Sequence, residues 1–360
     1  MRKSIITTGT VLALSFVLTG CGGGGDGIDS AIDASAEFGS AKSATVPAVA
    51  GTLPALPTDA IFAPTSFWYQ KIPTNTQLHP NTAGFVAEFL RLKTAYHNTV
   101  SISMESWSSP VYVVPSNIAV KQVKQLQCIQ GLALNPGLAQ QWAEVPVPDY
   151  AQSANGTDAE MTVYQPSTDT LWEFWKAKNT NGQWVGCWGG KMQNVSQSDG
   201  RWPTIYGTTA TGLPFLGGQV TAEELTRGEI RHAIGISLPE AEAAIGRSWP
   251  ATRSDGTNLN NVPNRIPQGL RFRLDPSVNV DLLKMKAAGK VIAKAAQVYG
   301  FVVWDTAGTI SIRSQNPKTY TAAGQPNPYP ALFDNAPQYT VLAGFPWDKL
   351  QFMPMDYGKP

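Results

Sequence analysis

Short runs of alternating or β-branched residues recur along the chain and predict strands. Successive side chains of a strand point to opposite faces, so such runs between turn residues are typical of sheets. Asn181-Gly182 and Ser254-Asp255-Gly256 are turn signals of this kind. The predicted strands are Val111–Val114, Met161–Tyr164, Leu171–Trp175, Gly269–Leu274, Phe301–Asp305 and Thr309–Ile312.

Two longer segments have helical spacing instead. The first follows Pro80-Asn81-Thr82, repeats apolar residues from Phe85 to Leu92 and fades near His97. The second opens at Asp275-Pro276 and ends at Gly300. Its apolar face contains Val278, Leu282, Met285, Ile292, Ala296 and Tyr299. Both segments therefore predict amphipathic helices that pack against a core.

Together these elements predict a mainly β fold, a β-sandwich or jelly-roll-like domain with a few peripheral helices. Aromatic residues recur from Ile61 to Tyr357 without a second linker or an internal repeat. We therefore expect residues 61–360 to form a single β-rich globular domain, with two lobes as the alternative.

The first residues have the pattern of an export signal. Met1-Arg2-Lys3 is a short cationic segment, a largely apolar run follows, and Leu18-Thr19-Gly20-Cys21 closes it. This pattern resembles a bacterial lipoprotein signal, and the four closing residues match the lipobox of that family. The resemblance implies that residues 1–20 are removed and that Cys21 carries a diacylglycerol and an acylated amino group, which together anchor the chain in a bilayer. A non-lipidated signal or a membrane-spanning anchor is the alternative.

Residues 21–60 have the composition of a flexible tether. Gly22–Gly25 is followed by Ala, Ser, Asp and Thr and then by proline-containing segments, with hardly a bulky aromatic residue. Gly22 after the cysteine, in place of Asp, favours transport onward to an outer membrane. The expected location is therefore the cell envelope, lipid-anchored at the outer membrane.

Charge is sparse and balanced. The chain has 27 Lys+Arg against 26 Asp+Glu, and charged residues make up only 15% of it, so it offers no basic field for nucleic acid. Losing Arg2 and Lys3 leaves 25 basic against 26 acidic residues, a formal charge of −1. The expected partners are therefore the bilayer, through acylated Cys21, and a polysaccharide. An apolar content of 42% is enough to fill a sizeable core.

Two cysteines remain once Cys21 is lipidated. Cys128 and Cys187 form an even pair in an oxidising compartment, which predicts one disulfide. Two separate buried thiols are the alternative.

The segment from Thr221 to Leu238 contains the most informative histidine. Thr221 and Glu224 have the spacing of a helix-capping box, and Glu229–Leu238 then alternates as a strand with His232 on its apolar face. His232 is either a hydrogen-bonded core residue or an acid or base at the floor of a cleft. Glu229 and His232 would face opposite sides of a strand, so we expect no metal and no cofactor.

Two acids and one arginine complete the predicted catalytic set. Glu173 and Asp305 lie within aromatic strands, where burial would raise a carboxyl pKa and suit paired acid and base roles. Arg271 and Arg273 share one strand face, and Arg271 could neutralise an acidic sugar. The alternative places these acids and arginines on solvated strand faces.

Tryptophan is concentrated in the middle of the chain among amide and hydroxyl residues. Flat aromatic faces beside hydrogen-bonding groups suit sugar rings. The predicted substrate-binding residues are Trp172, Trp175, Trp188, Trp202 and Tyr206. Phosphate-loop, dinucleotide-binding, zinc-protease and Gly-x-Ser-x-Gly motifs are absent from the sequence.

Three segments, Gly228–Ala233, Gly269–Leu274 and Tyr299–Asp305, resemble segments of secreted bacterial proteins that have no assigned activity. The expected location in the cell envelope and the candidate catalytic and sugar-binding residues together predict a lipid-anchored protein that acts on polysaccharide, as a lyase or a glycoside hydrolase. In that hypothesis His232 is the acid or base, with Glu173 and Asp305 as its partners. A non-catalytic lipoprotein for glycan binding or surface assembly is the alternative.

Overall fold

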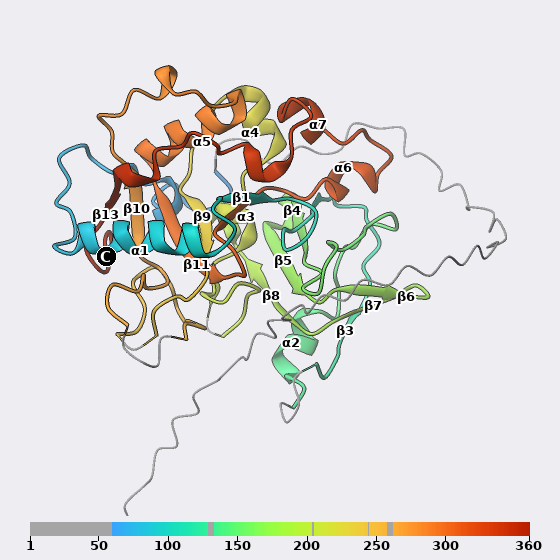
Figure 1. Ribbon diagram of the computed structural model, residues 1–360. Helices are drawn as coiled ribbons and strands as arrows, with labels where there is room; N and C mark the ends of the chain where they lie inside the picture. Colours follow the sequence, from blue (N-terminus) through green and yellow to red (C-terminus); the bar gives the residue numbers. More distant parts are fainter. Residues whose placement is uncertain (1–59, 129–132, 204, 244, 258–261) are drawn as a thin grey trace, which may run out of the picture. The chain divides into compact units, whose positions relative to one another are not determined.

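The computed structural model describes residues 60–360 apart from 129–132, 204, 244 and 258–261 (Figure 1). The predicted signal peptide, Cys21 and all but the last residue of the predicted tether lie outside the described residues. Within the described part of the chain, no helix is both long enough and apolar enough to cross a membrane.

The largest sheet has six strands in the order β1-β12-β9-β11-β10-β13. The pairs β1–β12 and β9–β11 are parallel, and the other neighbours are antiparallel. Its strands are β1 (Ser101–Ser103), β12 (Ser311–Arg313), β9 (Ile234–Leu238), β11 (Phe301–Thr306), β10 (Arg271–Leu274) and β13 (Leu350–Phe352).

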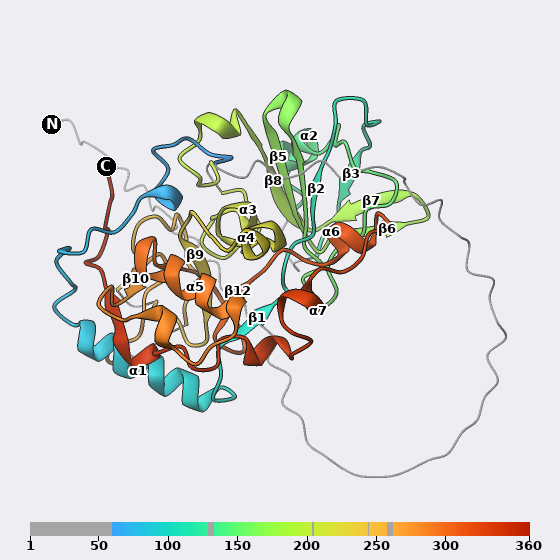
Figure 2. The same cartoon turned by 90° about the horizontal axis from the view of Figure 1, so that it is seen from above.

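Two smaller sheets lie on the side of the large sheet away from α1 (Figure 2). The four-stranded sheet has the order β2-β4-β5-β8, and the three-stranded sheet has the order β3-β7-β6. Their strands are β2 (Val111–Val113), β4 (Met161–Gln165), β5 (Thr170–Trp175), β8 (Trp188–Gln193), β3 (Val123–Gln125), β7 (Gln183–Gly186) and β6 (Lys178–Thr180).

Two helices are long and the rest are short. The α-helices are α1 (Thr82–Ala95), α2 (Pro136–Gln141), α3 (Phe215–Gly218), α4 (Ala222–Arg227), α5 (Ala287–Val298), α6 (Lys318–Thr321) and α7 (Tyr329–Leu332). The 3-10 helices are η1 (Phe67–Tyr69), η2 (Pro166–Thr168), η3 (Val195–Gln197), η4 (Val280–Leu282), η5 (Gln338–Thr340) and η6 (Trp347–Lys349).

The large sheet buries both faces. On one face Phe301 and Val303 pack in a core with Phe89 of α1 and Ile292 of α5. On the other face Val302 and Trp304 belong to a second core. That second core also contains Trp68, Phe215, Leu171 and Met192, so it joins the large sheet to the four-stranded sheet. Trp304 of β11 lies over Gly235 of the neighbouring strand β9, where only glycine fits, because a Cβ atom on Gly235 would lie 2.3 Å from the Trp304 ring.

The predicted strands are confirmed apart from shifts at their ends, the largest being in Glu229–Leu238, which is a strand only from Ile234. The predicted sandwich is correct only in part. Helix and strand make up nearly equal shares, 23% and 21%, so the fold is mixed α/β with three open sheets. Among the described residues we find no closed sandwich or barrel. The helices α1 and α5 each pack an apolar face against the core of the large sheet and turn their other faces outward, as their amphipathic spacing predicted.

The first predicted helix is confirmed as α1, whereas the second begins later than predicted. The chain from Asp275 to Lys286 forms turns and η4, and α5 starts at Ala287. Side chains compete with the helical backbone in this segment, because Asp275 accepts a hydrogen bond from the Ser277 N–H and Asn279 accepts one from the Asp281 N–H.

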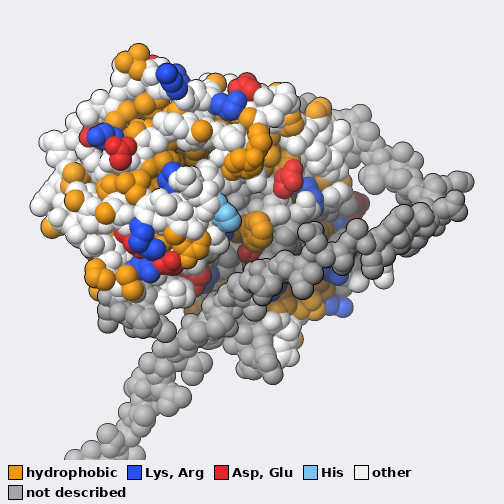
Figure 3. Space-filling view, in the orientation of Figure 1, with side chains coloured by type: hydrophobic (Ala, Val, Ile, Leu, Met, Phe, Trp, Pro, Cys, Tyr) orange, Lys and Arg blue, Asp and Glu red, His pale blue; other side chains and the backbone are white. Residues whose placement is uncertain are grey.

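Acidic and basic side chains are interspersed singly on the face shown in Figure 3. No broad field of one sign appears on that face, in agreement with the balanced composition.

Candidate functional site

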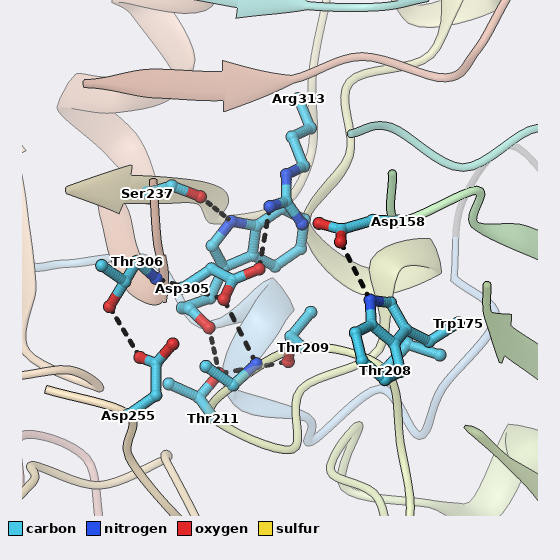
Figure 4. Close-up of polar contacts among 12 residues, drawn as sticks. Asp158, Trp175, Thr208, Thr209, Thr211, Ser237, Asp255, Asp305, Thr306 and Arg313 are labelled. Atoms are coloured by element: carbon cyan, nitrogen blue, oxygen red, sulfur yellow. Dashed lines mark hydrogen bonds and ion pairs between the residues drawn. The ribbon is translucent and has the colours of Figure 1, made fainter. Parts of the chain in front are cut away.

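Carboxyl groups from two sheets gather around one arginine, Arg313, and Figure 4 shows most of this arrangement. Asp305 lies on β11 and Arg313 ends β12, both in the six-stranded sheet, whereas Asp158 and Glu160 directly precede β4 of the four-stranded sheet. We call Asp158, Glu160, Asp305 and Arg313 the carboxylate cluster.

Arg313 is buried and only partly paired. Its Nη2 donates to Asp305 Oδ2 at 2.8 Å, and its side chain is 4% exposed. The guanidinium carbon lies 4.9 Å from the ring centre of Phe215 and 5.6 Å from that of Trp304. Its Nε and Nη1 have no hydrogen-bond partner among the described residues. Since unpaired buried donors are costly, this cation has unused capacity to bind an acceptor.

Asp305 is held by backbone donors beside Arg313. Its Oδ1 accepts from the Thr306 N–H at 3.1 Å and from the Ala210 N–H at 3.4 Å. Burial raises the pKa of Asp305 to about 6, against the lowering effect of Arg313. The nearby charges of Asp255 and Asp158 add to the increase. At pH 7 the Asp305 carboxyl group is therefore mainly ionised.

Glu160 has the opposite character. It is buried, and its Oε2 has no hydrogen-bond partner among the described residues. Burial raises the pKa of Glu160 to about 8; Arg313 opposes this change and Asp158 adds to it. At pH 7 Glu160 is therefore mainly protonated. Neighbouring carboxyl groups whose pKa values are pushed apart can serve as an acid and a base.

Asp158 connects the cluster to a predicted sugar-binding residue. The Trp175 indole N–H donates to Asp158 Oδ1 at 3.1 Å (Figure 4), and the Lys176 ammonium lies 4.4 Å from the centre of a Trp175 ring. The Lys176 N–H also donates to the Asp158 carbonyl at 2.6 Å. Trp175 is thus half-buried at the side of the cluster, with its N–H already used.

The backbone is strained beside Asp158. Ala159 has a φ of 39° and Lys176 a φ of 54°, in the left-handed region that residues other than Gly and Asn rarely adopt. Each such residue costs about 1–3 kcal/mol, and this kind of strain is concentrated at functional sites.

Arg253 fixes the loop that reaches Asp305. Its Nη2 donates to the carbonyls of Gly207 at 2.9 Å and Thr209 at 2.8 Å, and its Nε donates to Ala210 at 3.2 Å. Its Nη1 contacts the carbonyls of Ile205 and Tyr206. The loop therefore presents the Ala210 N–H to Asp305 in a defined position.

Asp255 is linked to Asp305 by hydrogen bonds through Thr306. Thr306 Oγ1 donates to Asp255 Oδ1 at 2.6 Å, and Gln268 Nε2 donates to the same oxygen at 2.5 Å. Figure 4 shows Asp255 and Thr306 on the side of Asp305 away from Asp158. Asp255 thus adds negative charge near Asp305 without contacting Arg313.

Glu173 is buried, and its hydrogen-bond partners all lie outside the carboxylate cluster. Its carboxylate accepts from Thr208 Oγ1 at 2.8 Å and from the Leu216 N–H at 3.1 Å. Burial raises the pKa of Glu173 to about 7, and these donors oppose the increase. The alternative of a solvated carboxylate on an outward strand face is wrong for Glu173, because the residue is fully buried.

His232 lies elsewhere, in an ion pair with Glu224. Its Nε2 is 3.0 Å from Glu224 Oε1, and its Nδ1 is 2.8 Å from the Ala233 carbonyl. Burial alone would lower the pKa of His232, but Glu224 outweighs it and the pKa is raised. The predicted strand starts only at Ile234, since the chain first leaves α4 at Gly228, in the left-handed region. The predicted capping box of Thr221 and Glu224 is present.

Arg271 is also placed apart from the other predicted catalytic residues. It is 1% exposed, and its guanidinium donates to the carbonyls of Phe67 at 3.1 Å, Gln70 at 2.6 Å and Tyr299 at 2.7 Å. Burial lowers its pKa to about 10. The geometry therefore assigns Arg271 to holding two backbone segments together, the end of η1 and the chain at Tyr299, and its N–H groups do not face an open site.

The remaining aromatic residues predicted to bind sugar have buried or half-buried rings. Trp172 and Trp202 are buried, and half-buried Trp188 stacks on Tyr206 with their ring centres 6.2 Å apart. The tryptophan most exposed among the described residues is Trp107, at 49%.

The predicted disulfide is present. Cys128 and Cys187 are bonded, with their Cα atoms 5.6 Å apart. It connects the end of the β3 segment to the turn between β7 and β8.

Sequence reasoning missed Asp158, Glu160, Arg253 and Arg313. Two acids directly before the apolar strand that starts at Met161 were the available signal. Arg313 had no such signal, because its acidic neighbour Glu160 and its aromatic neighbour Phe215 come from distant parts of the chain. Within the described ranges, no three His, Cys, Asp or Glu side chains form a group suited to a metal ion.

Comparison with known proteins leaves the site without a precedent. No family model matches the chain, and no curated protein or solved structure matches it significantly. Functional inference therefore depends on the chemistry of the site itself.

Proposed function

We propose that this protein is a lipid-anchored cell-envelope enzyme that cleaves polysaccharide, with the carboxylate cluster as its catalytic centre. The observation that supports this proposal is the pair of carboxyl groups beside Arg313, one with a pKa of about 6 and the other of about 8. Perturbed carboxyl groups concentrated at one place are typical of acid–base sites.

Hydrolysis of a glycosidic bond needs one acid and one base. Glu160, protonated at pH 7, donates its proton to the glycosidic oxygen as the bond from that oxygen to the anomeric carbon breaks. Asp305, ionised at pH 7, takes a proton from the attacking water, whose oxygen bonds to the anomeric carbon. One water is consumed and two shorter glycans are released. Arg313 keeps Asp305 ionised, because its positive charge lowers the pKa of that carboxyl group.

The lipobox supports the choice of a glycan as substrate, because the predicted envelope location exposes the protein to cell-surface and environmental polysaccharides. A lyase is the alternative chemistry at the same residues. There a base removes a sugar proton and the product is unsaturated, so the products distinguish the two reactions.

The test uses the full, lipidated protein in detergent micelles with a panel of neutral and acidic polysaccharides. New reducing ends are measured together with the ultraviolet absorbance of unsaturated products. We expect Glu160→Gln and Asp305→Asn each to lower turnover by about 10²–10⁴-fold.

Glu88→Gln is the matched control. Glu88 is also a buried carboxyl group. It forms ion pairs with Arg91 and Arg265, neither of which belongs to the carboxylate cluster. Its turnover should stay within a few-fold of the parent. Unchanged turnover in both cluster variants would refute the assignment. Glycan retention without any cleavage would instead support the non-catalytic glycan-binding lipoprotein.

A further inference from the structure

A polar groove lies outside the carboxylate cluster. Its volume is about 560 Å³, and its lining includes Gln193, Asn194, Gln197, Asp199, Arg201 and Trp202. A volume of this size is typical of small-ligand sites. None of the four cluster residues lines it, so the groove offers a second place for a ligand.

Three amide side chains of the groove are available for hydrogen bonding. Gln193, Asn194 and Gln197 are exposed, and their side chains make no hydrogen bond with the rest of the described chain. Each amide has an acceptor oxygen and two N–H donors. A sugar hydroxyl also donates and accepts, so it matches such groups in either direction.

The two charges in the groove neutralise each other. Arg201 Nη2 lies 2.6 Å from Asp199 Oδ2, and Arg201 Nε donates to the same oxygen at 2.7 Å. The groove therefore has no free charge of either sign with which to hold an anionic or cationic ligand. This favours an uncharged, hydroxyl-rich ligand.

The walls are held in place before any ligand arrives. Asp169 accepts hydrogen bonds from both the N–H and the hydroxyl of Ser196, which fixes η3. The Trp68 indole N–H donates to the Gly200 carbonyl at 3.0 Å. Gly200 has a φ of 86°, and a Cβ atom there would lie 2.5 Å from the Trp68 ring. A preorganised wall loses little entropy when a ligand binds.

We propose that this groove binds a short neutral oligosaccharide segment, through the three amides and across the exposed ring of Pro203. The inference goes beyond the proposed cleavage, because it concerns residues that take no part in the acid–base step. Binding here would hold a glycan chain on the protein whether or not the chain is cut.

The experiment is calorimetric titration of the full, lipidated protein in micelles with neutral xylotriose, cellotriose and maltotriose and with acidic trigalacturonate. We expect at least one neutral trisaccharide to bind more tightly than trigalacturonate. The double variant Gln193→Ala/Gln197→Ala should weaken that binding about tenfold, because it removes two hydrogen-bonding side chains.

Gln77→Ala is the control, since Gln77 is an exposed glutamine that does not line the groove. Its affinity should equal that of the parent, and circular dichroism should show all variants folded. No binding of any neutral trisaccharide, stronger binding of trigalacturonate, or equal affinity in the double variant would overturn the proposal. Asp305→Asn should bind as the parent does, so a failure of the cleavage proposal stays distinguishable from a failure of this one.

Discussion

Arg271 and Arg313 are both buried arginines on strands of the same sheet, yet their surroundings differ. Arg271 donates to three backbone carbonyls. Arg313 forms an ion pair with the Asp305 carboxylate, and its Nε and Nη1 have no hydrogen-bond partner among the described residues. Burial alone therefore does not distinguish an arginine with a structural role from one proposed to act in catalysis. The two arginines differ instead in how many of their N–H donors already have a hydrogen-bond partner.

The largest effect on stability is expected at the fully paired arginine. Arg271→Met would leave the carbonyls of Phe67, Gln70 and Tyr299 without their donor, at about 1–3 kcal/mol for each buried group. We expect a loss of roughly 4 kcal/mol in the free energy of unfolding, measured by urea denaturation. A loss below about 1 kcal/mol would contradict the structural assignment.

Arg313→Met should cost less stability and more activity. The substitution removes one ion pair but also two unpaired buried donors, so we expect a loss of about 1–2 kcal/mol. Without the cation the pKa of Asp305 should rise further, and turnover should fall even though the protein folds. Urea denaturation and the reducing-end assay on the same preparation measure both. A cost equal to that of Arg271→Met would remove the contrast.

Substitutions of His232 compare its ion pair with Glu224 to the carboxylate cluster. His232→Leu leaves Glu224 buried without its cation, although Thr221 still donates to it, and we expect a loss of about 2 kcal/mol in unfolding free energy. Turnover should remain unchanged, because the ion pair does not contact the cluster. His232→Gln, which keeps a donor, should recover part of the stability. A large loss of turnover in folded His232→Leu would restore His232 as the acid or base.

The last comparison concerns the pH dependence of stability. Glu160, Glu173 and Asp305 have pKa values raised to about 8, 7 and 6, so their ionisation in the folded state costs stability as pH rises through these values. The raised pKa of His232 acts in the same direction, since its contribution is complete below its unfolded pKa and is lost above its folded pKa. The melting temperature should therefore be higher at pH 5.5 than at pH 8.5.

Glu160→Gln provides the comparison for this measurement. Its amide does not titrate, so the variant should lose part of the difference in melting temperature between the two pH values. Scanning calorimetry at both pH values measures it. A parent protein that is more stable at pH 8.5 would contradict the raised carboxyl pKa values.

Local features of the fold were predictable, whereas the arrangement of the sheets was not. Alternation within Met161–Tyr164 or Leu171–Trp175 identifies a strand, and the Thr221–Glu224 spacing identifies a helix cap. Alternation does not reveal that β9 lies beside β11 and β12, because these strands are brought together from distant parts of the sequence. The order of the strands in the mixed sheets therefore required the structure.

Within the carboxylate cluster, only Asp305 was predictable from the sequence. Glu173, which lies outside the cluster, is buried and Asp305 is half-buried, and both have raised pKa values, as acids embedded in aromatic strands suggested. His232 and Arg271 were selected by residue type, and residue type does not show that Glu224 and three carbonyls already satisfy them. Glu160 and Arg313 depend on a contact between two sheets, which no spacing along the chain encodes.

The Cys128–Cys187 bond closes a loop that contains α2 and the strands β4 to β7. The exposed Asn181-Gly182 turn lies inside this loop. A protease that cut there would leave two polypeptides joined by the disulfide and by the pairing of β5 with β8 across the cut. In an environment rich in secreted proteases, a single nick would therefore not release a fragment. The two pieces would separate on a gel only after a reductant is added.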